Sequence, residues 1–128
     1  MDEKQKPRVL IIDDAPMLLN ILGNILKEDY TIIAIKDGEK AIASAKKNKP
    51  AIILLDIMMP GMSGFDVITA LKADEETKNI PVIFLTGDGS KESKEKCYQL
   101  GAVDYIEKPF IANIVKERVA VNIQRFSS

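Results

Sequence analysis

The sequence predicts an α/β fold, a three-layer sandwich in which helices cover both faces of a five-stranded parallel sheet. Five short, continuous apolar runs alternate with segments that carry apolar residues at helical spacing. Continuous runs are typical of strands buried on both faces, whereas strands with one wet face alternate between apolar and polar residues. Short connections between the two kinds of segment imply right-handed crossovers.

The apolar runs predict five strands, at 8–12, 30–35, 51–55, 81–85 and 103–106. Each run is too short for a buried helix and has the length of an ordinary strand. Because five strand-helix units follow one another, the expected strand order is 2-1-3-4-5, as in flavodoxin-like folds.

The first three predicted helices begin at recognisable signals. Pro16 suits the first turn of a helix that carries apolar residues over 17–26. Asp37 is a plausible N-cap for a second helix, which has apolar residues within 41–45. The segment Ser63-Gly64-Phe65-Asp66 has capping-box spacing and should open the third helix.

A fourth helix is predicted from about Ser90 to Leu100, where Gly101 suits the C-cap. A fifth should run from Ile111 to about Phe126. Acidic and basic side chains are interleaved on the fourth helix, which favours a solvated mixed-charge face over a basic patch. These side chains are Lys91, Glu92, Lys94, Glu95 and Lys96.

Length and composition favour one ordinary globular domain. A chain of 128 residues with 46% hydrophobic and 29% charged residues has a common single-domain size and shows no repeat or low-complexity tract. Its net charge of -1 lacks the positive excess that neutralises a phosphate backbone. Direct binding to nucleic acid is therefore not expected.

Several kinds of chemistry and location are excluded by what the chain lacks. It contains no histidine, which excludes Ser-His-Asp, Cys-His and His-ligated zinc sites within the chain. Cys97 is the single cysteine and allows no internal disulfide. The apolar runs are far shorter than the ~20 residues that span a bilayer, and Met1–Lys4 opens no signal peptide. We expect a cytoplasmic protein without membrane association.

Polar side chains follow four of the five predicted strands. Asp13 and Asp14 follow the first strand, Asp56 the third and Thr86 the fourth, while Lys108 lies just beyond the fifth. The carboxyl ends of parallel strands meet at one edge of the sheet, and ligands of open α/β sheets bind there. Three carboxylates, a hydroxyl and an ammonium should therefore converge.

Three aspartates in one place repel each other unless a cation lies among them, which predicts a divalent metal. Oxygen ligands without His or Cys favour a hard ion, Mg²⁺ with Mn²⁺ as the alternative. A carboxylate can also be a nucleophile in phosphoryl transfer, and Asp56, which stands apart from the pair, is the better candidate. Lys108 and Thr86 would then contact the incoming phosphoryl oxygens.

Taken singly, each of these residues also has a purely structural interpretation. Asp13 or Asp14 could cap the first helix, and Asp56 could end a strand before a turn. Residues 86–89 could form a plain turn, and Lys108 could be a solvated surface lysine. Their convergence at one sheet edge favours the functional interpretation.

From about Pro7 to Phe126 the chain resembles the receiver domain of bacterial two-component response regulators, of the chemotaxis-regulator-like kind. The resemblance is carried by motifs in a fixed order, which are residues 9–14 (VLIIDD), residues 55–64 (LDIMMPGMSG), Thr86-Gly87 and residues 101–110 (GAVDYIEKPF). It implies a receiver domain over 7–126 with terminal tails at 1–6 and 127–128.

The resemblance assigns an acceptor and a metal pocket. Asp56 matches the phosphoacceptor of the family. Asp13 and Asp14 match its Mg²⁺ pocket, which Asp56 and the backbone carbonyl of Met58 would complete.

The resemblance also assigns a switch. Thr86 and Lys108 match the pair that contacts the phosphoryl group, and Tyr105 matches the aromatic residue that turns inward when Thr86 moves. From its own residue type, Tyr105 is equally well interpreted as a half-buried strand aromatic. Lys108-Pro109 matches a peptide bond that is cis in the family.

The implied partners are those of a signalling switch rather than an enzyme. A histidine kinase or a histidine phosphotransfer domain would donate the phosphoryl group, and the domain would catalyse only its own phosphorylation and dephosphorylation. The face formed by the fourth helix, fifth strand and fifth helix would then bind a downstream output domain or target protein. An activation-dependent homodimer through that face is a further hypothesis.

Other interpretations stay open. A phosphorylation-independent interaction module would share the fold, although the complete set of polar residues argues against it. An aspartyl-phosphate phosphatase of the haloacid dehalogenase kind would want a second acid at Met58, and an FMN carrier would want a hydroxyl- and glycine-rich loop in place of Asp13-Asp14. A free-standing receiver and a piece of a larger regulator or hybrid kinase are both possible. We favour the piece, since residues 115–119 resemble receivers that precede output domains.

Overall fold

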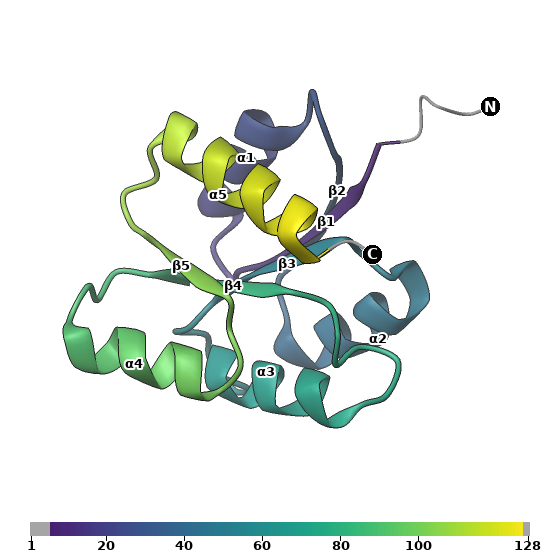
Figure 1. Ribbon diagram of the computed structural model, residues 1–128, viewed down its shortest axis with the longest axis vertical. Helices are drawn as coiled ribbons and strands as arrows, with labels where there is room; N and C mark the ends of the chain where they lie inside the picture. Colours follow the sequence, from purple (N-terminus) through teal and green to yellow (C-terminus); the bar gives the residue numbers. More distant parts are fainter. Residues whose placement is uncertain (1–5, 127–128) are drawn as a thin grey trace.

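The computed structural model describes residues 6–126, in which five strands alternate with five helices (Figure 1). The strands are β1 (Arg8–Ile12), β2 (Thr31–Ile35), β3 (Ile52–Asp56), β4 (Val82–Thr86) and β5 (Asp104–Glu107). The helices are α1 (Pro16–Leu26), α2 (Gly38–Asn48), α3 (Gly64–Ala73), α4 (Lys91–Gln99) and α5 (Ala112–Phe126). The predicted tails lie outside the described residues except for Lys6.

The strands form one parallel sheet in the order β2-β1-β3-β4-β5, which confirms the predicted fold and strand order. Helices α1 and α5 cover one face of this sheet, and α2, α3 and α4 cover the other (Figure 1). Within residues 6–126, no helix combines the length and apolarity that a bilayer crossing would need.

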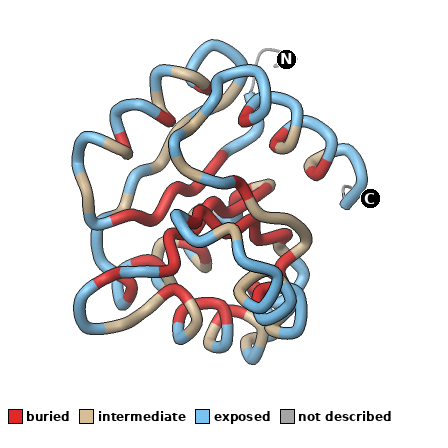
Figure 2. Tube along the Cα trace, turned by 90° about the vertical axis from the view of Figure 1, so that its left-hand side faces the viewer, coloured by how far each residue is buried: buried red, intermediate tan, exposed pale blue. Residues whose placement is uncertain are grey.

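Each face of the sheet carries its own apolar cluster. Along β1, the side chains of Val9 and Ile11 pack with α1 and α5, whereas those of Leu10 and Ile12 pack with α2 and α3. All four are fully buried, and Figure 2 shows the buried strands surrounded by helices with exposed outer surfaces. Full burial of each such side chain contributes about 1.5–3 kcal/mol relative to exposure.

The predicted helix signals are confirmed. Pro16 is the first residue of α1, and the Asp37 carboxylate caps α2 by accepting from two backbone N–H groups. Ser63 and Asp66 form the reciprocal capping box at the start of α3. Gly101 follows α4 with φ 107°, the left-handed conformation that glycine adopts readily.

Strands β3, β4 and β5 begin and end one residue later than predicted. The parallel ladder continues through polar residues at their ends, because Asp56 pairs with Leu85 and Thr86 pairs with Glu107. Asp56 and Thr86 are therefore the last residues of strands, where backbone pairing fixes their positions, and not the first residues of loops.

Candidate functional site

The carboxyl-terminal edge of the sheet brings the predicted polar residues together. One carboxylate oxygen from each of Asp13, Asp14 and Asp56 lies within 4.8 Å of the others. The Lys108 ammonium donates to Asp56 Oδ1 at 3.0 Å. Lys108 is therefore an ion-pair partner from beyond β5, and its interpretation as a solvated surface lysine is wrong.

The two carboxylate oxygens of Asp13 have different surroundings. Oδ1 accepts from the Ala15 backbone N–H at 3.0 Å, whereas Oδ2 is buried and has no hydrogen-bond partner among the described residues. Burial raises the pKa of Asp13, the Ala15 N–H and Lys108 lower it, and repulsion from Asp56 and Asp14 raises it further. A buried acceptor without a donor costs free energy that a cation would recover.

The interpretation of the aspartate pair as a helix cap is wrong. The N-cap of α1 is Ala15, which has no side-chain cap. Asp13 bonds to the N–H of that N-cap residue itself, and Asp14 is exposed.

The donor set of this edge fits a hard divalent cation. It offers three carboxylates and no nitrogen or sulfur ligand, which suits Mg²⁺ or Mn²⁺. The unpartnered Oδ2 of Asp13 supports that fit. Met58, whose backbone carbonyl is the fourth predicted ligand, lies in the loop that follows β3, with its side chain 80% exposed.

The hydroxyl of Thr86, the last residue of β4, bonds to the loop that follows the strand. It donates to the Asp88 carbonyl at 3.1 Å and accepts from the Asp88 N–H at 2.9 Å. The local geometry of 86–89 is therefore a turn, as the structural interpretation expects. Thr86 also lines a cavity of about 490 Å³ together with Asp56 and Lys108, so its hydroxyl lies beside the acidic site.

The position of Asp56 depends on a close backbone approach by Gly64. An ideal Cβ on Gly64 would lie 2.2 Å from the Asp56 carbonyl oxygen and 2.8 Å from the Ile57 Cα. The Gly64 N–H also donates to the Ile57 carbonyl at 2.8 Å. The capping-box pattern predicts where α3 begins, but it contains no signal for this contact with the end of β3.

Tyr105 is half-buried on β5 and contacts two side chains of α4. Its ring packs edge-on against Tyr98, with centroids 6.0 Å apart, and Lys94 Nζ lies 4.6 Å from its centroid. The predicted solvated face of α4 thus needs correction at Lys94, because the partner on β5 is remote in sequence. The bond between Lys108 and Pro109 is cis.

The sequence matches the family model of the response regulator receiver domain over residues 9–120. A curated relative from Vibrio cholerae serotype O1, a probable cyclic di-GMP phosphodiesterase, is 37% identical over 124 residues. That match covers 97% of this chain but 28% of the relative. Histidine kinase P4 of Formosa agariphila is 36% identical over 91% of this chain, which spans 9% of that kinase.

Solved structures show the same similarity. A putative response regulator from Chloroflexus aurantiacus J-10-fl superposes with a TM-score of 0.90 at 28% identity, covering 94% of this chain and all of that one. The receiver domain of sensor histidine kinase PA1611 from Pseudomonas aeruginosa PAO1 has a magnesium ion coordinated in its active-site cleft. It superposes with a TM-score of 0.86 at 26% identity, covering 93% and 98% of the two chains.

The predicted chemotaxis-like character has looser support. Chemotaxis protein CheY4 of Vibrio cholerae superposes with a TM-score of 0.86 at 28% identity, over 95% of this chain and 99% of CheY4. That similarity is no greater than the similarity to the putative response regulator from Chloroflexus aurantiacus, which superposes with a higher TM-score at the same identity.

Proposed function

The chain belongs to the family of response regulator receiver domains, and we propose that residues 7–126 accept a phosphoryl group on Asp56 in a Mg²⁺-dependent reaction. The observation that carries the proposal is the setting of Asp56. This carboxylate closes β3, is 3% exposed, accepts from the Lys108 ammonium and lies beside two further aspartates. A nucleophile, a fixed positive charge and a set of cation ligands therefore share one sheet edge.

The reaction is a transfer between two nucleophiles. An Asp56 carboxylate oxygen attacks the phosphorus of a phosphohistidine and forms an O–P bond, while the P–N bond of the donor breaks and its electron pair stays on the imidazole nitrogen. Lys108, already 3.0 Å from the carboxylate, stabilises the negative charge of the phosphoryl oxygens.

The metal pocket would consist of Asp13, Asp14, Asp56 and the Met58 backbone carbonyl. Mg²⁺ bound there would supply electrostatic stabilisation of the carboxylate and phosphoryl oxygens. Its charge would also satisfy the orphaned Oδ2 of Asp13.

Thr86 and Tyr105 form the proposed switch. The Thr86 hydroxyl exchanges its bonds to Asp88 for a bond to the phosphoryl group, and Tyr105 then turns toward the space beside Thr86. Phosphorylation shifts an existing equilibrium of the α4–β5–α5 face, which changes its partners. The domain is in this proposal a signalling switch and not an enzyme acting on other substrates.

The proposed phosphodonor is a histidine kinase or a histidine phosphotransfer domain. The proposed downstream partner is an output domain or a separate target protein. Two longer relatives, a probable cyclic di-GMP phosphodiesterase and a histidine kinase, support both roles. An activation-dependent homodimer through α4–β5–α5 remains a hypothesis, and sedimentation that finds the same monomer with and without beryllofluoride would remove it.

The decisive experiment is phosphorylation by a small donor. The protein is incubated with Mg²⁺ and acetyl phosphate, and intact mass is expected to show one added phosphoryl group. Asp56→Asn and omission of Mg²⁺ should each abolish the gain, whereas Asp29→Asn, which changes an exposed aspartate, should keep it. Metal-independent labelling, or labelling that persists in Asp56→Asn, contradicts the proposal. Absence of both labelling and beryllofluoride binding would favour the phosphorylation-independent interaction module.

A further inference from the structure

The ring of Tyr105 is held by contacts that come from outside the acidic site. Lys94 Nζ lies 4.6 Å from the centroid of the ring, and Tyr98 packs against it edge-on. Lys94 also lies 3.5 Å from the Glu107 carboxylate, with the Lys94 side chain only 28% exposed. One ammonium group therefore contacts two side chains of β5 that are separated by a single residue.

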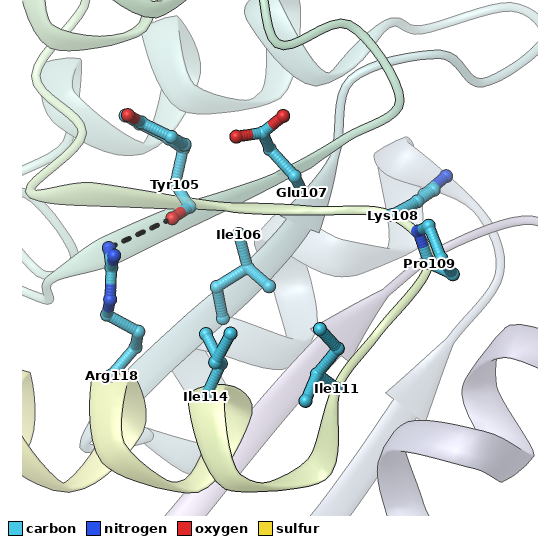
Figure 3. Close-up of a pocket in the computed structure, with 8 residues that line it drawn as sticks. All are labelled: Tyr105, Ile106, Glu107, Lys108, Pro109, Ile111, Ile114 and Arg118. Carbon is cyan, nitrogen blue, oxygen red and sulfur yellow. Dashed lines mark hydrogen bonds between the residues drawn. The ribbon is translucent and has the colours of Figure 1, made fainter.

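The backbone of β5 is anchored on its opposite side by α5. Arg118 donates to the Asp104 carboxylate at 2.6 Å and to the Tyr105 carbonyl at 3.4 Å, and Asn122 donates to the same carboxylate at 3.1 Å. In Figure 3 the side chains of Tyr105 and Glu107 lie on the side of β5 opposite to α5. Because the backbone is held, a change of state at Tyr105 must come from its side chain.

Glu107 also packs on the loop that follows Thr86. An ideal Cβ on Gly89 would lie 2.1 Å from a Glu107 carboxylate oxygen, so the carboxylate fills the space that this glycine leaves free. The loop contains Asp88, whose backbone bonds the Thr86 hydroxyl. The Lys94–Glu107 pair therefore joins α4, β5 and the β4–α4 loop.

We propose that Lys94 and Glu107 form a clasp that holds Tyr105 in its present position and opposes the switch in the unphosphorylated protein. This inference rests on the proposed function, because it concerns the regulation of the same site. Tyr105 cannot turn toward Thr86 without leaving the Lys94 ammonium, so the clasp adds to the cost of the active state and sets its resting population. The interaction with Tyr105 and, less strongly, the charge of Glu107 raise the pKa of Lys94, which keeps the amine charged.

The test is the affinity of the Mg²⁺-loaded protein for beryllofluoride, which mimics the phosphoryl group. Lys94→Met should tighten binding by about threefold, since a half-buried cation–π contact is lost from the resting state only. Electrostatics alone predicts the opposite sign, because a lost lysine charge weakens the binding of an anion. Lys91→Met removes the same charge from an exposed position of the same helix and should not tighten binding.

A second readout follows Tyr105 directly. In protein labelled with 3-fluorotyrosine, the fluorine signal that Tyr105→Phe removes should move, in unphosphorylated Lys94→Met, toward the position it takes with beryllofluoride. Glu107→Gln should move it the same way and serves as the second variant if Lys94→Met unfolds.

The outcomes separate the clasp from the proposed function. If wild-type protein binds beryllofluoride, but Lys94→Met neither tightens binding nor moves the signal, the clasp is wrong and the receiver function stands. If the wild-type protein binds no beryllofluoride, the proposed function fails and the clasp fails with it, because there is then no switch to oppose.

Discussion

Buried polar groups at the two ends of the β-sheet differ in whether they have hydrogen-bond partners. At the carboxyl-terminal end, Asp13 is fully buried, its Oδ2 has no partner among the described residues, and burial raises its pKa. At the amino-terminal end, Thr77 is 1% exposed, yet its hydroxyl donates to the Leu71 carbonyl at 2.6 Å. Lys72 in turn donates to two backbone carbonyls within 78–80, each at 3.0 Å.

This difference separates stability from function within one small domain. A satisfied buried polar group stabilises the fold, whereas an unsatisfied one is retained only where it serves a ligand. The amino-terminal end of the sheet is therefore built for stability. The carboxyl-terminal end gives up stability and keeps three carboxylates that could hold a cation, which the proposed function requires.

The largest loss of stability should come from a substitution at Gly64, where two backbone segments approach closely beneath the site. Gly64→Ala should lower the free energy of unfolding by about 2–3 kcal/mol, because the new methyl group overlaps backbone atoms at the end of β3. Urea unfolding measures the loss. Gly23→Ala is the matched control, since an ideal Cβ there would lie 4.0 Å from Ile32 Cγ2, and it should instead stabilise α1 by about 0.5–1 kcal/mol. If Gly64→Ala is as stable as the wild type, Gly64 is not needed for the close approach to the end of β3.

Thr77→Val removes a buried hydrogen bond at the amino-terminal end of the sheet. It should cost about 1–2 kcal/mol, because an isosteric apolar group removes the buried donor to the Leu71 carbonyl. Urea unfolding again gives the value, and Thr77→Ser, which keeps the hydroxyl, should lose less. Mg²⁺ affinity should stay unchanged in both variants, and a change there would mean that the two ends are coupled.

Asp13→Asn, at the carboxyl-terminal end, should stabilise the metal-free protein, whereas the two preceding substitutions destabilise it. The metal-free protein should gain roughly 1 kcal/mol, because a neutral amide costs less to bury than a carboxylate and relieves the repulsion from Asp56 and Asp14. Mg²⁺ should raise the melting temperature of the wild type, and this rise should be absent in the variant. A variant that melts lower than wild type without metal would show that the carboxylate is not under strain.

The same carboxyl group predicts a pH dependence. Its folded-state pKa lies above the ordinary value of 3.8, so between these two pKa values the folded state binds more protons than the unfolded state. The contribution of Asp13 to stability is therefore present below pH 3.8 and is lost as pH rises through the folded pKa. The difference in unfolding free energy between wild type and Asp13→Asn, measured without metal from pH 4 upward, should grow with pH in favour of the variant.

The smallest effect is expected at the partly exposed pair between Lys46 and Asp74 near the amino-terminal end. Their side chains meet at 2.7 Å, and this hydrogen bond raises the pKa of Lys46 and lowers that of Asp74. Water and salt still reach this pair and screen it, so Lys46→Met should unfold at nearly the wild-type urea concentration. A clear loss of unfolding free energy in Lys46→Met that persists in high salt would show that the amino-terminal end of the sheet depends on this pair.

The local signals of the chain were sufficient for the fold. Continuous apolar runs, the capping residue Asp37 and the Ser63–Asp66 box predict the elements, because each is a property of neighbouring residues. The predicted bounds differ from the observed ones by one residue at both ends of β3, β4, β5 and α4, and at the starts of β2 and α5. At the ends of β3 and β4, the ladder extends into Asp56 and Thr86 through pairing with other strands.

By itself, the sequence determined that Asp13, Asp14, Asp56 and Lys108 would meet, because parallel strands deliver their carboxyl ends to one edge of the sheet. Only the tertiary structure decided that Asp13 Oδ2 has no partner within residues 6–126 and that Thr86 bonds the loop after β4. It also decided that Lys94 reaches Tyr105 and Glu107. These features depend on side-chain directions and on distances between elements remote in the chain, and no local pattern of residue types encodes either.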